Sequence, residues 1–244
     1  MTIYLGKDMN YIIYNKGKRE NNEDFYRVYE HNDKTIIAVA DGVGGYNAGE
    51  IASRIAVDTV CEYFENWEIN LANITEAFIE ANMQILSGQE KHPGMKSTLV
   101  ALFVSGDNAY VANVGDSRAY QVRDNSLIFK SKDHSLVRVL ADAGVITEDE
   151  METHEDRNKI LRAMGIGKEL RVDITELDVE DDDWFILTTD GFWQHISDKE
   201  LMQQEDIIKW FKGREDYILN TDLIEQDNFT AVLYRRTNEN RNMG

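Results

Sequence analysis

The sequence has only one cysteine, Cys61, and only one proline, Pro93, in 244 residues. A single cysteine excludes a framework of intramolecular disulfides and a metal site built from several thiolates, and it fits a reducing compartment. The chain has no run of about 18 apolar residues of the kind that a membrane-spanning helix needs. Its first residues, MTIYLGKDMN, lack the basic and then apolar order of a signal peptide. We therefore expect a cytoplasmic protein with no membrane association.

Basic residues are also scarce. Lys and Arg together number 26 against 45 for Asp and Glu, which gives a formal net charge of −19. A nucleic-acid-binding protein needs a basic surface, so this balance argues against that class. An acidic chain that handles a phosphorylated substrate needs cations to offset the repulsion between like charges.

No proline-rich, glycine/serine-rich or repetitive stretch divides the chain. We therefore expect one domain over residues 1–236, followed by a polar tail at 237–244. A polar, weakly patterned run that follows Gly144 is expected on the surface. We expect the protein to be a monomer.

The hydrophobic pattern predicts short strands, then two long helices, then more strands. Apolar residues recur at helical spacing over 48–67 and 74–85, and a shorter helix is expected over 134–143, beginning at His134. The predicted strands are 11–14, 25–29, 35–40, 98–104, 109–114, 118–123, 127–130, 174–177, 184–189 and 229–234. Short turns between them imply antiparallel pairing, so the order favours an α+β sandwich over a doubly wound sheet.

Acidic residues stand at the ends of several otherwise apolar strands. They are Asp41 and Asp190, each followed by glycine (Gly42 and Gly191), Asp227 before the last strand, and Glu23 and Asp24 before the strand that starts at Phe25. Any one Asp-Gly pair is ordinary turn chemistry. Several carboxylates at one sheet edge repel one another and call for a counter-ion.

The chemistry of these side chains favours a hard cation. Oxygen ligands without clustered His or Cys favour Mg²⁺ or Mn²⁺ over zinc. Two such ions polarise a water and hold the attacking and leaving oxygens of a phosphoryl displacement. Arg19, shortly before Glu23, offers a donor fork for a phosphate, although an arginine taken alone is more often a solvated surface charge. The pattern therefore predicts metal-assisted hydrolysis of a phosphate ester.

Six motifs in order give the chain a family resemblance. They are Arg19–Asp24, Val39–Gly45 with Ala48–Ser53, Asn113–Tyr120, Lys132–Ser135, Leu187–Gly191 and Asp227–Thr230. With them the chain resembles the metal-dependent Ser/Thr protein phosphatases of type 2C (PPM), in their compact bacterial form. The resemblance implies a central antiparallel β-sandwich flanked by pairs of helices, in α-β-β-α layers. It also implies two Mg²⁺ or Mn²⁺ ions at one end of the sandwich.

The same resemblance implies a role for each site residue. Asp41 would bridge two metal ions, Gly42 would offer its carbonyl, and Asp190 and Asp227 would bind one ion. Glu23 and Asp24 would hold metal or its waters, and Arg19 would grip the phosphate. Asp116 would contribute to a third, weaker metal site, the alternative being a turn residue in a hairpin. Residues 144–165 resemble the family's flap, a substrate-selecting element beside the active site.

The chain departs from the family pattern at three positions. Val43 stands where some eukaryotic members have a histidine proposed as general acid, so the leaving group's proton must come from metal-bound water or another residue. Tyr46 stands where His is often found, and Lys96 replaces a small residue. Neither of the last two has an evident role, and none of the three changes removes a predicted metal ligand.

We predict a phosphatase for phosphoserine and phosphothreonine in proteins that uses metal-activated water, with Arg19, Asp41 and Asp190 in the catalytic roles. Its partners would be a phosphorylated protein and a cognate Ser/Thr kinase. Two alternatives remain, a regulatory pseudophosphatase that only binds a partner and a hydrolase of small phosphomonoesters.

Overall fold

Two antiparallel β-sheets pack face to face in the computed structural model, which describes residues 9–44, 48–151, 153–221 and 226–236. One sheet has the strand order β1-β11-β10-β7-β8, and the other has the order β2-β3-β5-β6-β9 with β4 paired to β3. Every paired strand runs antiparallel to its neighbour. The strands are β1 Met9–Asn15, β2 Asp24–His31, β3 Lys34–Val43, β4 Lys96–Ser97, β5 Leu99–Ser105, β6 Asn108–Val114, β7 Arg118–Arg123, β8 Ser126–Lys130, β9 Asp173–Leu177, β10 Trp184–Thr188 and β11 Phe229–Arg235.

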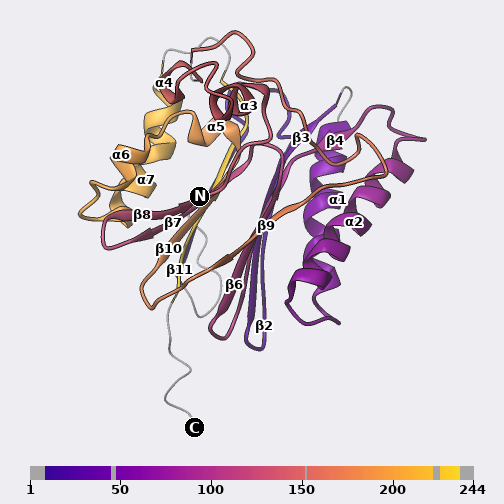
Figure 1. The fold of residues 1–244 in the computed structure, drawn as a ribbon, viewed down its shortest axis with the longest axis horizontal. Helices are drawn as coiled ribbons and strands as arrows, with labels where there is room; N and C mark the ends of the chain where they lie inside the picture. The colour runs from indigo at the N-terminus through magenta and orange to yellow at the C-terminus, as the bar shows by residue number, and fades with distance from the viewer. Residues whose placement is uncertain (1–8, 45–47, 152, 222–225, 237–244) are drawn as a thin grey trace.

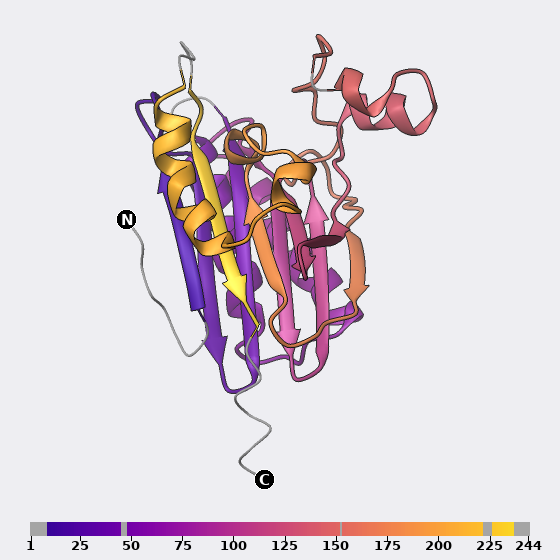
Figure 2. The same ribbon diagram turned by 90° about the vertical axis from the view of Figure 1, so that its left-hand side faces the viewer.

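Helices cover the outer face of each sheet, which gives four layers (Figure 1). Long helices α1 and α2 pack on the β2–β9 sheet, and α7 packs on the other sheet with the short α5 and α6. Helices α3 and α4 project at one end of the sandwich (Figure 2). The helices are α1 Ala48–Tyr63, α2 Leu71–Gly88, α3 Leu136–Asp142, α4 Glu148–Met151, α5 Asp190–Trp193, α6 Asp198–Leu201 and α7 Ile207–Leu219.

The predicted fold class, an α+β sandwich with antiparallel sheets flanked by helices, is confirmed. The central strands are apolar on both faces because they pack on helices on one side and on the other sheet on the other side, whereas the edge strands β8 and β9 are partly exposed. On β3, Ile36 and Ala38 face α1 and α2, whereas Ile37 and Val39 face the opposite sheet. This two-sided burial explains why the strand reads as a continuous apolar run.

Several predicted boundaries were wrong. The first helix ends at Tyr63 and not at Trp67. The polar run after Gly144 is mostly exposed, as predicted, but it contains the short helix α4, whose Met151 is buried. The third helix does not begin at His134: Ser135 caps it by accepting a bond from the Arg138 N–H at 3.3 Å. Serine at this position satisfies an otherwise unpaired amide of the first turn, which histidine does less well.

The layer between the sheets changes character at one end. Along β3 and its neighbours the inward positions are apolar, as at Ile37, Val39, Val100 and Leu187. Side chains in a strand alternate between faces, so the next inward positions are Asp41, Thr98 and Thr189. The inter-sheet core therefore ends in polar and acidic residues, at the end of the sandwich near α5 (Figure 1).

Among the described residues, no helix combines the length and the apolar character that crossing a bilayer requires. The predicted tail, 237–244, and Tyr46 lie outside the described residues.

The hairpin between β7 and β8 offers a test of the turn chemistry. Asp124 and Asn125 both have positive φ, 47° and 59°, in a two-residue turn. Asparagine tolerates this region better than alanine does. We expect Asn125→Ala to lower the free energy of unfolding by about 1 kcal/mol and Asn125→Gly to leave it nearly unchanged, measured by urea denaturation. An alanine variant as stable as the parent would contradict this.

Candidate active site

The candidate site is built where β2, β3, β10 and β11 bring their acidic ends together. Asp24 at the start of β2 is the register partner of Asp41 near the end of β3. Thr189, the residue after β10, donates its N–H to the Thr230 carbonyl of β11 at 3.0 Å. The two sheets thus contribute side chains to one polar cluster at this end of the inter-sheet layer.

Asp24 joins the two sheets. Its Oδ2 accepts the hydroxyl of Thr189 at 2.8 Å and that of Thr230 at 2.7 Å, and only 1% of the residue is exposed. Burial raises the pKa of Asp24 from 3.8 to about 8, although both threonine bonds lower it. Asp190 and Asp227 raise this pKa further because like charges disfavour the ionised form.

Asp41 sits among four other carboxylates. Burial raises its pKa well above 3.8, and Asp190, Asp24, Asp116 and Asp227 add to the rise. Thr98 fixes its backbone through two bonds, because the Asp41 N–H donates to Thr98 Oγ1 at 2.9 Å and the Asp41 carbonyl accepts the Thr98 N–H at 2.9 Å.

Gly42 allows the backbone of β3 to approach the first turn of α1. A Cβ at Gly42 would lie 2.0 Å from the Gly49 carbonyl oxygen and 2.8 Å from that of Glu23. No side chain fits in this space, so glycine is required by the close approach. The Gly42 N–H donates to the Glu23 carbonyl at 3.1 Å, which ties Glu23 to Asp41.

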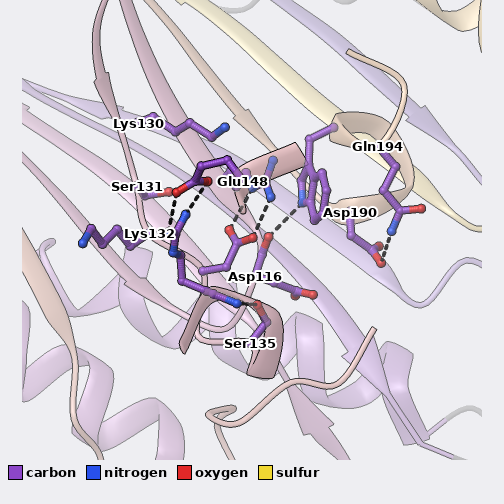
Figure 3. Close-up of polar contacts among 12 residues, drawn as sticks. Asp116, Lys130, Ser131, Lys132, Ser135, Glu148, Asp190 and Gln194 are labelled. Carbon is purple, nitrogen blue, oxygen red and sulfur yellow. Dashed lines mark hydrogen bonds and ion pairs between the residues drawn. The ribbon is translucent and has the colours of Figure 1, made fainter. Parts of the chain in front are cut away.

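Asp116 and Asp190 approach each other from the β6–β7 turn and from α5 (Figure 3). Burial raises the pKa of both, to about 6 for Asp190, and Asp190 further raises that of Asp116. Asp190 Oδ2 accepts from the Gln194 amide at 3.1 Å. Asp116 is 5% exposed, and its buried Oδ1 has no hydrogen-bond partner in the described part of the chain. Unpaired buried carboxylate oxygens are costly unless a cation compensates them.

Trp193 of α5 pins this helix to the Asp116 turn. Its indole N–H donates to the Asp116 carbonyl at 2.8 Å (Figure 3). The Arg118 guanidinium lies 3.4 Å above the Trp193 ring and forms a bidentate pair with buried Asp133, at 2.8 and 2.6 Å. This stack fixes the distance between the elements that carry Asp116 and Asp190.

Arg19, Glu23 and Asp227 form the outer part of the cluster. Arg19 binds Asp227 through both branches of its fork, Nε to Oδ1 and Nη2 to Oδ2, each at 3.0 Å. Burial raises the pKa of Glu23, Asp227 raises it further, and Arg19 lowers it. Asn228 accepts the Glu23 N–H at 2.8 Å and donates to the carbonyls of Lys16 and Asn21, so it holds the segment from Lys16 to Glu23 against β11.

The donor set fits a hard divalent cation. All the side-chain donors are carboxylates, they raise one another's pKa, and the orphaned Asp116 Oδ1 points to a missing positive partner. Within the described residues, no three acidic, His or Cys side chains already form a metal-holding group. Asp227 is paired with Arg19, Asp190 with Gln194, and Asp24 with two threonines. The structure thus brings the predicted residues within electrostatic reach, and their roles as ligands stay a prediction.

The predicted flap region, residues 144–165, is linked to the Asp116 turn through His134, whose backbone N–H donates to the Gly115 carbonyl at 2.9 Å. Its α4 is tethered to α3 by Glu148, which accepts two bonds from Arg138 at 2.8 and 2.5 Å (Figure 3). Residues 160–164 attach it to the body of the protein, because Ser97 and Met164 exchange backbone bonds and the Leu161 N–H donates to the His134 carbonyl at 2.7 Å. Arg157 is exposed. Val43, which is 48% exposed, lies opposite Lys96 of β4.

Four hydroxyl residues of the site were not predicted from the sequence: Thr98, Ser117, Thr189 and Thr230. These hydroxyls position Asp24, Asp41 and the Asp116 turn, and all four are buried. Their signal is present in the sequence, since each continues the inward-facing alternation of its strand with a small polar residue. Polar residues at inward positions near a strand end therefore indicate a functional site with positioned side chains.

A family model and a curated protein are similar to this chain over most of its length. Residues 15–226 match the family described as Protein phosphatase 2C. The chain is 34% identical over 204 residues to the serine/threonine phosphatase stp of Listeria welshimeri, which covers 78% of this chain and 79% of that protein.

Solved structures share the fold over nearly the whole chain. The serine/threonine phosphatase PstP/Ppp of Mycobacterium tuberculosis superposes with a TM-score of 0.83 at 28% identity, covering 95% of this chain and 99% of that one. The catalytic domain of PstP in complex with two manganese ions gives a TM-score of 0.80 at 27% identity, with the same coverage.

The raised pKa values predict how the metal-free protein responds to pH. The folded state binds protons more tightly than the unfolded state, at a pKa of about 8 for Asp24 and about 6 for Asp190 against 3.8. The contribution of these two groups to the free energy of unfolding is therefore largest below pH 3.8. It is lost as the pH rises through 6 for Asp190 and 8 for Asp24. We expect the free energy of unfolding of EDTA-treated protein, measured by urea denaturation, to fall as the pH rises from 3.8 to about 8.

Asp24→Asn should remove part of this slope, because the amide stays neutral at every pH. The matched control is Asp149→Asn, an exposed carboxylate on α4, which should keep the parental slope. A metal-free protein whose stability is constant or rises across the range would contradict the assignment of buried, mutually repelling carboxylates.

Proposed function

This chain belongs to the protein phosphatase 2C family, as its six motifs predicted, and we propose that it is a metal-dependent phosphatase for phosphoserine and phosphothreonine in proteins. The observation that carries the proposal is the group of carboxylates, drawn from both sheets, at one end of the sandwich. The serine/threonine phosphatases among its relatives support this substrate class.

We propose that two Mg²⁺ or Mn²⁺ ions bind here, and the PstP catalytic domain, solved in complex with two manganese ions, supports this number. Asp41, the Gly42 carbonyl, Asp190 and Asp227 would hold them, with Glu23 and Asp24 holding metal or its waters, and Asp116 would serve a third, weaker site. When bound, such ions polarise the attacking water and offset the charge of the phosphate.

The protein's own residues set the geometry of the reaction. The threonine bonds to Asp24 and the backbone bonds to Asp41 fix these two carboxylates before the substrate arrives. Pre-organised charge stabilises a transition state without a cost of reorganisation. Residues 144–165, which resemble the family's flap, would contact the protein part of the substrate.

Arg19 would hold the phosphate. Its guanidinium is half exposed and already forms a two-pronged bond with a planar anion, the Asp227 carboxylate. A phosphate presents the same pair of acceptor oxygens. We propose that Arg19 exchanges Asp227 for the substrate phosphate when Asp227 takes its role as a ligand. A Ser/Thr kinase would generate the substrates.

The test is hydrolysis of a phosphothreonine peptide, measured as released phosphate. We expect turnover with Mn²⁺ or Mg²⁺, none with EDTA, and a fall in kcat of about 10²-fold or more for Asp41→Asn or Asp190→Asn. Asp198→Asn on α6 is the control, because its carboxylate binds Lys130 and is not one of the proposed metal ligands.

Three outcomes would overturn the proposal. Activity in EDTA, or full activity in Asp41→Asn, would remove the metal mechanism. Metal binding without turnover of any phosphopeptide would favour a pseudophosphatase that docks a partner. Faster turnover of sugar phosphates than of peptides would favour a small phosphomonoesterase.

Arg19→Lys separates charge from geometry. Lysine keeps the positive charge but cannot form the bidentate contact. We expect Arg19→Met to lower kcat/KM for the phosphopeptide about 10- to 100-fold, with most of the change in KM, and Arg19→Lys to recover only part of it. Unchanged kinetics in Arg19→Met would show that Arg19 is a surface charge.

A further inference from the structure

The turn that carries Asp116 is held on the side of Asp41 by two hydroxyls. Thr98 Oγ1 lies 2.7 Å from Ser117 Oγ and also accepts the Asp41 N–H at 2.9 Å. Gly115 has a φ of +108°, and a Cβ there would lie 2.6 Å from the Thr98 side chain. The turn therefore packs tightly on Thr98, which precedes β5, and Thr98 in turn binds Asp41 of β3. These contacts fix one side of the turn.

His134 holds the other side of the same turn. The backbone N–H of His134 donates to the Gly115 carbonyl at 2.9 Å. The backbone N–H of Gly115 donates to the ring nitrogen Nδ1 of His134 at 3.0 Å. Because Nδ1 accepts, the neutral ring carries its proton on Nε2, which lies 3.2 Å from Asp173 Oδ2. Burial lowers the pKa of His134, in keeping with a neutral ring.

Asp173 also ties His134 to the flap region. Arg162 Nη1 donates to Asp173 Oδ1 at 2.9 Å and lies 3.0 Å from His134 Nε2. Since Nε2 carries a proton, Arg162 and His134 both donate to Asp173 and not to each other. Arg162 belongs to the flap region, residues 144–165. In the same segment, the Leu161 N–H donates to the His134 carbonyl. One histidine thus contacts both the flap region and the Asp116 turn.

The position of the Asp116 carboxylate depends on this backbone. Its buried Oδ1 has no hydrogen-bond donor among the described residues, so that oxygen is not positioned by a neighbouring side chain. Its direction is set by the turn, and the turn is set by the Gly115 bonds. A small rotation at Gly115 would move Asp116 relative to Asp190.

We propose that His134, held by Asp173 and Arg162, is a positioning residue that fixes the Gly115–Asp116 turn and couples the flap region to metal binding at Asp116. This inference rests on the proposed role of Asp116 as a metal ligand. Indirect partners of this kind typically change metal affinity about 10- to 100-fold when they are lost.

Two substitutions separate the two nitrogens of the ring. His134→Asn places an amide oxygen near the position of Nδ1, so it keeps the acceptor for the Gly115 N–H. His134→Gln places its amide group near the position of Nε2, so it keeps the contact with Asp173 and loses that acceptor. Both are neutral and polar, which makes them a matched pair for a buried position.

The first readout is calorimetric titration of the metal-free protein with Mn²⁺. We expect His134→Gln to weaken the weakest Mn²⁺ site about tenfold and to leave the tighter sites unchanged, as Asp116→Asn should do. His134→Asn should bind within about threefold of the parent. The second readout is exchange of the Gly115 amide hydrogen, which should be faster in His134→Gln only.

Arg162→Met tests the connection to the flap region. We expect a loss of about threefold at the same weak site, no larger than that of His134→Asn, because both variants keep the Nδ1 acceptor and lose contacts at Asp173, whereas Arg171→Met should bind Mn²⁺ like the parent. Arg171 also faces Asp173, at 3.6 Å, but its side chain is 77% exposed. Binding by Arg162→Met that equals that of Arg171→Met would overturn the coupling.

Equal Mn²⁺ binding by His134→Gln and the parent, or equal losses at all sites in both histidine variants, would overturn the positioning role. Neither readout requires turnover. A failure of the proposed phosphatase function would appear in the peptide assay of the parent protein, and a failure of this inference would appear in the titrations.

Discussion

Repulsion among carboxylates at one end of the inter-sheet layer is the constraint on which the rest of the site depends. Asp24, Asp41, Asp116 and Asp190 each have a raised pKa, and burial is the largest cause in all four. Folding places these groups together only because the hydrocarbon core beneath them is large and packed on both faces of each sheet. The stability of the sandwich therefore offsets the cost of the site.

The sheet geometry determines which residues meet. Antiparallel pairing sets Asp24 opposite Asp41, and strand alternation turns the inward positions polar where the apolar layer stops. Asp24 then accepts hydroxyls from the opposite sheet. A shift of one residue in any of these strands would turn its acid or threonine outward, so strand register links the core to the chemistry.

Much of this arrangement was predictable from local pattern. The apolar runs that end in Asp-Gly indicated both the strands and the acids, because both signals lie within a few residues. His134 was wrongly predicted as the start of a helix, because its partners Gly115, Arg162 and Asp173 lie 19, 28 and 39 positions away in the sequence and meet it only in the tertiary fold. The pairing of Arg19 with Asp227 spans 208 positions, and no local spacing encodes it.

The inner and outer carboxylates differ in how firmly they are held. Asp24 and Asp116 are 1% and 5% exposed, whereas the side chains of Arg19 and Asp227 are 52% and 49% exposed. An exposed ion pair contributes little to stability and exchanges partners easily, while a buried carboxylate keeps its place. An incoming phosphate would therefore meet the adjustable half of the site and find the fixed half already assembled. This division lets an acidic chain with a net charge of −19 accept an anionic substrate, because long-range repulsion is screened by salt and the local partners decide.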